Sequence, residues 1–264
     1  MYEEFYGLIE KPFNKTPDPR YLYQSRQHAE ALARLQHAVE EQDIVLLTGD
    51  IGSGKTTLSR ALIDSLNESY HPVLIINPRL SPAQLLRTVA LRLGMDGSIR
   101  YRHGILEGIN AKLYELYEAG KRTVIIIDET QLIPGKATFE ELRLLTNFQL
   151  DDRNLLALVL IGQTELRERL QRRHYRALRQ RIGMQYHLGP LDQEEAEAYV
   201  LHRLKVAGRD RVLFNKQALA RLHEHSGGVP RRINIIAGNA LVEGFGQEAE
   251  IIGPEIIESV VKDQ

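Results

Sequence analysis

One segment constrains this chain more than any other: Gly49-Asp50-Ile51-Gly52-Ser53-Gly54-Lys55-Thr56, which fits the pattern G-x-x-x-x-G-K-[ST]. An apolar run at 44–47 leads into it, and a helical pattern that starts near Thr57 follows it. Glycines let the backbone curl until successive N–H groups face phosphate oxygens, and the start of the new helix adds positive charge. The motif in this context predicts a strand, a phosphate-binding loop and a helix.

Within this loop, each polar side chain has an expected role. Lys55 is expected to reach the β- and γ-phosphates of a nucleotide, and Thr56 to hold Mg²⁺. We expect the stretch from Gly49 to Thr57 to contact ATP before a reaction and ADP after it. A chance glycine-rich turn is the alternative interpretation, and the flanking strand and helix patterns count against it.

The bulk composition is that of a globular protein without membrane spans. The chain has 264 residues, enough for one large domain or for a domain and a smaller one, and its net charge of −1 draws it to neither nucleic acid nor acidic lipid. It contains no cysteine, and its N-terminus lacks the apolar core of a signal peptide. The longest apolar stretch, at 155–161, is too short to cross a bilayer. We therefore expect a cytoplasmic protein with no direct insertion into a membrane.

Strand and helix patterns alternate through the first part of the chain, which predicts an α/β fold with a doubly wound parallel sheet, as in P-loop NTPases. After Gly189-Pro190 only helical patterns remain, with Asp192 and Asn215 as expected N-caps. We expect a nucleotide-binding domain over 1–189 and a C-terminal all-helical lid domain over 190–264. The expected strands are 44–48, 72–77, 123–127, 155–161 and 185–188, and the expected helices are 26–42, 57–67, 81–94, 102–119, 140–148, 164–181, 192–207, 215–227, 231–245 and 254–261.

The N-terminal segment 1–25 contains three prolines and several aromatic residues, too many for a disordered tail. It predicts an ordered strap that packs on the body of the protein. A second interpretation, that the strap walls an adenine pocket, is the less favoured one for any single aromatic residue.

The run Thr123-Val124-Ile125-Ile126-Ile127 predicts a strand buried on both faces, and Asp128-Glu129 follow it directly. Ligands bind at the carboxyl ends of strands in open α/β sheets, so these two carboxylates are candidates for a catalytic site. Asp128 is expected to hold Mg²⁺ through water, and Glu129 to polarise the attacking water as general base. The alternative is a solvated strand end, and the preceding phosphate-binding motif makes it the weaker one.

These motifs resemble an AAA+ ATPase, and more closely the ATPase domain of the general secretion pathway protein A family. The further segments that carry this resemblance are Phe13 with Pro17-Asp18-Pro19, Asp128-Glu129-Thr130-Gln131, Leu160-Ile161-Gly162-Gln163, Gln180-Arg181-Ile182, Pro190-Leu191, Tyr199, His202-Arg203-Leu204, Ala207-Gly208 and Gly228-Val229-Pro230-Arg231-Arg232-Ile233-Asn234. Thr130 departs from the alanine usual in that family. The family's protein continues into a membrane span and a peptidoglycan-binding domain, whereas this sequence stops at Gln264. We therefore expect a stand-alone ATPase domain.

The resemblance implies roles for several further residues. Gln163 matches sensor 1, and Arg231 matches sensor 2 in the lid. Arg181 matches an arginine finger that acts in trans on a neighbour's nucleotide, with Arg179 as the alternative. Asn77, at the end of a predicted strand, could restrain Glu129, although a turn-forming asparagine is the simpler interpretation.

The leading hypothesis is an oligomeric, Mg²⁺-dependent ATPase that remodels or recruits a protein partner in secretion, pilus or polysaccharide export. A less favoured alternative is a DNA-binding regulator of the transposition or initiator type, motivated by the arginines within 164–181. A solvated or subunit-facing surface is the favoured interpretation of these arginines. A third alternative is a nucleotide switch with negligible turnover.

Overall fold

The computed structural model describes residues 1–14, 19–99 and 101–263, so Pro17 and Asp18 of the quoted motifs lie outside the described residues. Contacts divide the chain into two compact units. We call them the helical unit, made of 1–27, 50–57 and 189–264, and the sheet unit, made of 28–49 and 58–188. Each is described by itself, and the domain boundary expected at Gly189 stays a prediction.

The sheet unit is built on a five-stranded sheet whose paired strands all run parallel. The strand order is β2-β3-β4-β1-β5. This order places β1 inside the sheet between later strands, as the expected doubly wound fold requires, so that prediction is confirmed. The strands are β1 (Ile44–Gly49), β2 (Tyr70–Ile75), β3 (Arg122–Ile127), β4 (Leu156–Gly162) and β5 (Ile182–Leu188).

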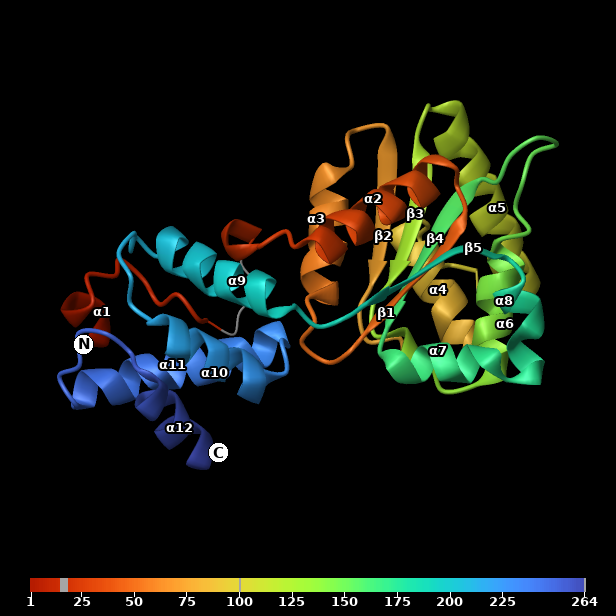
Figure 1. Ribbon diagram of the computed structural model, residues 1–264. Helices are drawn as coiled ribbons and strands as arrows, with labels where there is room; N and C mark the ends of the chain where they lie inside the picture. Colours follow the sequence, from red (N-terminus) through yellow and green to blue (C-terminus); the bar gives the residue numbers. More distant parts are fainter. Residues whose placement is uncertain (15–18, 100, 264) are drawn as a thin grey trace. The chain divides into compact units, whose positions relative to one another are not determined.

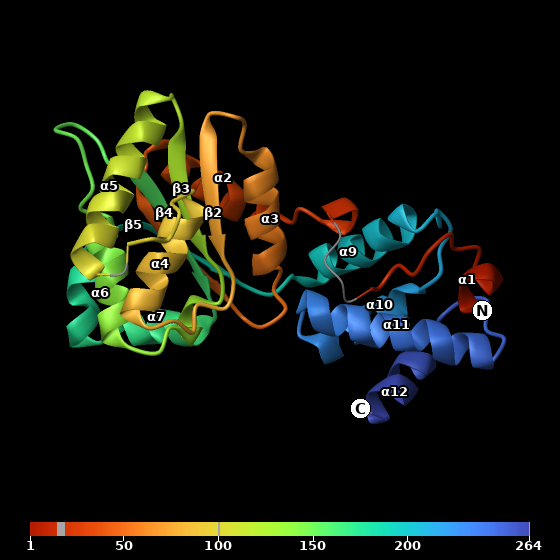
Figure 2. The same cartoon turned by 180° about the vertical axis from the view of Figure 1, so that it is seen from behind.

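Helices cover both faces of this sheet (Figures 1 and 2). On one face, Val45 and Leu47 of β1 pack with α2 and α3, and on the other face Ile44 and Leu46 pack with α4 to α7. Alternating side chains of the same strand are therefore all apolar, which is the pattern of a central strand in a parallel sheet. The covering helices are α2 (Arg26–Glu40), α3 (Lys55–Ser65), α4 (Pro82–Arg92), α5 (Arg102–Glu118), α6 (Lys136–Leu145) and α7 (Thr164–Gln171).

Strand β2 forms one edge of the sheet and, within the part of the chain that the structure describes, pairs with β3 alone. It contains Pro72, whose side chain is exposed and whose nitrogen carries no hydrogen. Proline is tolerated in a sheet only where no hydrogen bond to a neighbouring strand is lost, and the outer side of an edge strand meets this condition.

The helix expected over 164–181 is interrupted, and this prediction was wrong. The chain instead forms α7, a short 3₁₀ turn η3 (Arg173–Tyr175) and α8 (Arg176–Arg179), with extended backbone at Arg172 (ψ 145°). On an unbroken helix, the face that buries Leu166 and Leu170 would continue at two polar residues, 173 and 174. The break brings Tyr175 inward instead, where its ring lies 5.1 Å from that of Phe139.

The helical unit contains the four long helices that follow the sheet in the chain: α9 (Gln193–Val206), α10 (Lys216–Ser226), α11 (Pro230–Gly246) and α12 (Pro254–Lys262). The expected caps are confirmed. The Asp192 carboxylate accepts from the Glu195 backbone N–H at 2.8 Å in a capping box, and Asn215 accepts from Ala218 at 2.8 Å. None of the helices within the described ranges is long and apolar enough to span a bilayer.

The N-terminal strap is ordered in its described parts, which include the short α1 (Tyr2–Phe5) and the 3₁₀ turn η1 (Pro19–Tyr21). Tyr6 and Phe13 are buried in one cluster with α9 to α12. Arg203 of α9 holds the strap, because its Nε donates to the Pro12 carbonyl at 2.6 Å and its guanidinium lies 4.6 Å from the Tyr21 ring. A second bond, from Nη1 to the Tyr199 hydroxyl at 3.0 Å, completes a nearly water-free site for this charge.

Replacing Arg203 with methionine is expected to release the strap. The variant keeps an apolar stem but leaves the Pro12 carbonyl and the Tyr199 hydroxyl without their donor, a loss of about 2–3 kcal/mol for bonds from a charged group. Hydrogen exchange at Ile9, whose N–H donates to the Ala207 carbonyl at 2.9 Å, reports on the strap directly. Exchange there should accelerate, whereas unchanged protection would contradict this role for Arg203.

Candidate active site

The phosphate-binding loop follows β1 without a gap, and α3 begins at Lys55. Gly52 and Gly54 have φ angles of 84° and 102°, conformations that side chains disfavour, so both motif glycines are required by the backbone. Lys55 is only 6% exposed, and its ammonium donates to the Asp50 carbonyl at 2.8 Å. This strand–loop–helix arrangement fits a phosphate group.

Arg231, near the start of α11, lies against this loop. Its backbone N–H donates to the Gly52 carbonyl at 3.3 Å, and a Cβ added at Gly52 would lie 2.4 Å from the Arg231 Cβ. The predicted phosphate loop and the predicted sensor 2 residue are thus neighbours within the helical unit. The sensor role itself stays a prediction.

Gly52→Ala is expected to weaken nucleotide binding. Alanine disfavours the left-handed backbone at this position, and its methyl group would clash with the Arg231 side chain. The loop must therefore move, at a cost of about 1–3 kcal/mol. That cost corresponds to a rise in the ATP dissociation constant of about tenfold to a hundredfold. Gly120→Ala is a matched control, because Gly120 also has a positive φ of 73° but its added Cβ would have nothing within 4 Å. Equal affinities for the Gly52→Ala protein and the wild type would contradict this account of the loop.

The two carboxylates after β3 occupy different environments. Asp128 is 3% exposed and its backbone N–H extends the sheet by donating to the Ile75 carbonyl at 3.0 Å. Glu129 has left-handed backbone (φ 54°, ψ 37°), and its N–H donates to the Asp128 side chain at 2.8 Å. A non-glycine residue in this region carries strain, and such residues gather at functional sites.

The Glu129 side chain is held by two amides. Gln163, directly after β4, donates from Nε2 to Glu129 Oε2 at 3.2 Å, and Gln131 donates to the same oxygen. The structure therefore joins the predicted base and the predicted sensor 1 residue. Asn77, which the sequence suggested as a restraint on Glu129, is exposed. The described residues include no hydrogen bond from Asn77 to Glu129.

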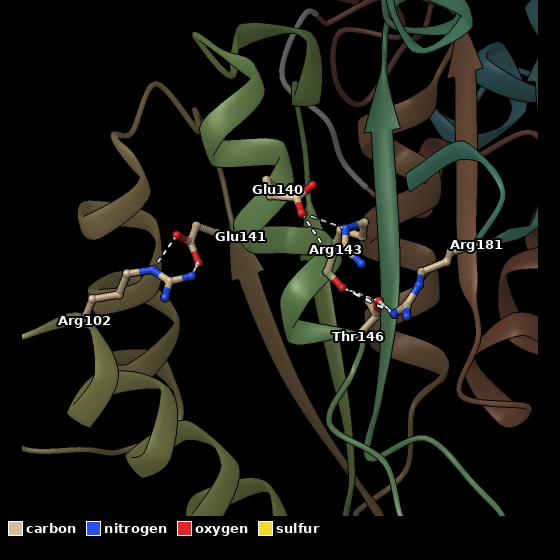
Figure 3. A network of polar contacts seen from close by, with 6 residues as sticks. All are labelled: Arg102, Glu140, Glu141, Arg143, Thr146 and Arg181. Carbon is tan, nitrogen blue, oxygen red and sulfur yellow. Dashed lines mark hydrogen bonds and ion pairs between the residues drawn. The ribbon is translucent and has the colours of Figure 1, made fainter. Parts of the chain in front are cut away.

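The side chain of Arg181, the predicted finger, contacts the C-terminal end of α6 in the same chain (Figure 3). Its Nη1 donates to the Thr146 hydroxyl at 2.9 Å and to the Arg143 carbonyl at 3.5 Å. A cation is favourable at the C-terminal end of a helix, and the side chain stays exposed. Arg179, the alternative finger, donates from Nη1 to the Gln171 side chain at 2.7 Å.

Two ion pairs involve α6, the helix that the Arg181 side chain contacts (Figure 3). Arg102 of α5 forms a two-pronged pair with the buried Glu141, with both N–O distances at 2.8 Å. Arg143 donates two hydrogen bonds to Glu140 and thereby lowers the pKa of that carboxyl. These ion pairs connect α6 to α5 and stabilise the last turns of α6, which Arg181 contacts.

The residues expected to hold Mg²⁺ offer the right chemistry. Thr56 presents a hydroxyl on an exposed side chain, and Asp128 a carboxylate, and these hard oxygen ligands suit a small divalent cation that keeps several waters. No group of three or more histidine, cysteine, aspartate or glutamate side chains that could hold a metal ion occurs among the residues described here. Gln131 belongs to the site although it is not among the residues predicted for it. Its polar side chain, two positions after the predicted base, was the available signal.

Sequence comparisons match this chain to a protein family and to a known protein. Residues 36–170 match the AAA domain family. General secretion pathway protein A of Aeromonas hydrophila is 42% identical over 253 residues, which cover 94% of this chain and 45% of that protein. The chain thus spans somewhat less than half the length of this relative.

Solved structures share the fold at low sequence identity. The Aeropyrum pernix ORC2 protein, solved as ADPNP and ADP complexes, superposes with a TM-score of 0.71 at 18% identity, covering 96% of this chain and 71% of that one. Cdc6p of Pyrobaculum aerophilum gives 0.71 at 14% identity, covering 97% and 71%. The RuvB Holliday junction branch migration motor of Thermotoga maritima gives 0.57 at 21% identity, covering 90% and 67%. The expected AAA+ fold is confirmed.

Proposed function

Because this chain belongs to the AAA domain family, we propose that it is a Mg²⁺-dependent ATPase that works as an oligomer on a protein partner. One observation carries the enzymatic part of the proposal. The acidic pair Asp128-Glu129 directly follows β3, at the same end of the parallel strands at which Gly49 ends β1 and the phosphate loop begins. Hydrolysis of a nucleoside triphosphate requires a phosphate-binding loop and a general base, and both candidates follow the carboxyl ends of strands in this sheet.

The loop residues bind the substrate in this proposal. Backbone N–H groups of Gly52 to Thr56 and the start of α3 receive the phosphates, and Lys55 exchanges its bond to the Asp50 carbonyl for one to a phosphate oxygen. Thr56 and Asp128 hold Mg²⁺, which when bound neutralises charge on the β- and γ-phosphates.

Glu129 supplies the proton transfer. Its carboxylate takes a proton from the attacking water, whose oxygen forms a bond to the γ-phosphorus. The bond between that phosphorus and the bridging oxygen breaks, and ADP leaves with the electron pair. Gln163, which already donates to Glu129, orients the water, and Arg231 stabilises the charge on the phosphates.

Steady-state ATP turnover tests the proposal. Phosphate release should be saturable, should require Mg²⁺ and should stop when EDTA is added. Absence of turnover at every protein concentration, with tight ATP binding retained, would identify a nucleotide switch and would reject the enzyme.

The oligomer follows from the role proposed for Arg181, which leaves Thr146 and reaches a neighbouring subunit's nucleotide. Arg181→Ala should lower turnover by about 10³-fold, the usual worth of such a finger. Mixing this variant with Glu129→Gln subunits should restore activity, because a site with its own Glu129 then receives Arg181 from the next subunit. Random mixing leaves about a quarter of the sites complete. Mixed assemblies that stay inactive would contradict action in trans.

The partner is inferred from the relative's name. General secretion pathway protein A points to a protein partner in an envelope or export system, and secretion, pilus and polysaccharide export are the proposed settings. The proposed location is the cytoplasm, where ATP is abundant. A pull-down with the Glu129→Gln protein, held with ATP bound, identifies the partner.

A second candidate function is ATP-dependent DNA binding. Four arginines of this region are exposed, and none of them has an ion pair within the described ranges: Arg167 in α7, Arg172 at the break, Arg173 in η3 and Arg176 in α8. Such a basic surface can neutralise phosphates. A gel shift with ATP that weakens steeply with salt would favour this candidate, and absence of a shift at low salt would eliminate it.

A further inference from the structure

Gln131 connects the candidate base to the end of the neighbouring strand, and no function has yet been given to it. We infer that Gln131 is a positioning residue, which together with Gln163 holds Glu129 by one carboxylate oxygen and leaves the other oxygen to accept the proton from water. This inference rests on the proposed ATPase function and names a further residue on which that reaction depends.

Both ends of the Gln131 amide are used. Its Nε2 donates to Glu129 Oε2, and its Oε1 accepts the backbone N–H of Gln163 at 3.1 Å. This pattern needs an amide, because a carboxylate could not donate to Glu129 and an apolar side chain could do neither. Gln131 thus links the side chain after β3 to the main chain after β4.

The backbone around Gln131 is shaped to place it there. The left-handed Glu129 starts a 3₁₀ turn, η2 (Thr130–Leu132), which brings the side chain at 131 back beside the one at 129. The buried Thr130 hydroxyl pins the turn by donating to the Ile127 carbonyl at 2.8 Å. From α7, Arg169 donates to the Gln131 carbonyl at 3.3 Å.

Gly162, the last residue of β4, leaves the space that the amide oxygen occupies. A Cβ at Gly162 would lie 2.9 Å from Gln131 Oε1 and 2.5 Å from a Leu166 methyl group. Any larger residue at 162 would therefore push the amide away from the Gln163 N–H. Because Gly162 has no side chain, the connection from β4 to the base can form.

The two oxygens of Glu129 are consequently unequal. Oε2 accepts from both amides, whereas Oε1 accepts no hydrogen bond from the described part of the chain. Two donors on one oxygen stop rotation of the carboxylate and leave Oε1 to take the proton. Two other charged groups contact this turn: Asp128 accepts the Glu129 N–H, and Arg169 donates to the Gln131 carbonyl.

Replacing Gln131 with leucine tests the positioning role. We expect kcat to fall by about tenfold to a hundredfold, because the carboxylate loses one anchor and its orientation. The dissociation constant of a fluorescent ATP analogue should change less than about twofold, because the orientation of Glu129 matters for the reaction step and not for the binding of ATP. Gln185→Leu is the matched control, because Gln185 is exposed on β5 and makes no described side-chain hydrogen bond.

Gln131→Glu tests the role in a second way, through the pH profile of kcat, which should not shift if Gln131 only stabilises the fold. The new carboxylate keeps the shape and can still accept the Gln163 N–H, but it faces Glu129 Oε2 with a second negative charge. Two adjacent carboxylates resist ionising together, so the acidic limb of the kcat profile should shift upward by about one pH unit or more. Gln185→Glu should leave the profile in place.

The outcomes separate this inference from the proposed function. Wild-type protein without turnover rejects the ATPase proposal itself. Wild-type turnover together with unchanged kcat in Gln131→Leu, or with an unshifted pH profile in Gln131→Glu, overturns only the role of Gln131. If the leucine variant fails to fold, the nearly isosteric glutamate variant decides alone.

Discussion

Lys55→Ala is expected to abolish ATP turnover and to raise the ATP dissociation constant by about a hundredfold or more, which is the largest effect we predict. The ammonium of Lys55 is almost buried and is held only 2.8 Å from the Asp50 carbonyl, so it is positioned before nucleotide arrives. In the variant, the phosphates lose the ammonium group and the Asp50 carbonyl loses this donor. Titration with a fluorescent ATP analogue and a phosphate-release assay measure the two losses separately.

A lysine outside the loop serves as the control for general loss of charge. Lys216 is exposed at the start of α10, and its replacement with alanine should change neither binding nor turnover. Turnover in the Lys55→Ala protein within a factor of two of wild type would reject the phosphate-binding role of the loop, whatever the state of the other residues.

Glu129→Gln is expected to lower turnover by about 10²–10⁴-fold while ATP binding is kept. The amide has the shape of the carboxylate and can still accept from Gln131 and Gln163 through its oxygen, but it cannot take a proton from water. The protein should therefore bind ATP and hold it. A binding titration and single-turnover phosphate release test this directly.

The control for this variant is Glu68→Gln, at an exposed position with no described side-chain hydrogen bond. It should hydrolyse ATP like wild type. A Glu129→Gln protein that turns over at the wild-type rate would remove Glu129 as the base and would point to another group on the sheet edge.

Features with a local cause could be predicted from the sequence. The glycines of the phosphate loop, the apolar run before Asp128 and the capping box of Asp192 with Glu195 each follow from residues within a few positions of one another. Helix and strand ends moved by a few residues, as for β2, which begins at Tyr70 and not at Pro72.

Features with a distant cause could not be predicted in this way. The break at Arg172 is explained by packing of Tyr175 on Phe139, which is separated from it by 36 positions in the chain. The bond that Gln131 accepts from the Gln163 N–H joins residues 32 positions apart, and it accompanies a left-handed backbone at Glu129 that no residue pattern indicates. The anchor of the strap, Arg203, lies 191 positions from the Pro12 carbonyl that it binds. Such contacts arise only when the whole fold has formed.

The proline at the sheet edge has a consequence for how copies of this protein can meet. An open strand edge is a template on which a second chain can add its own strand, and this route leads readily to uncontrolled aggregation. Pro72 removes one donor from β2 and so makes a continuous sheet across two molecules unfavourable at this edge. For the oligomer proposed above, contacts through helical and loop surfaces are therefore favoured over strand pairing at the β2 edge.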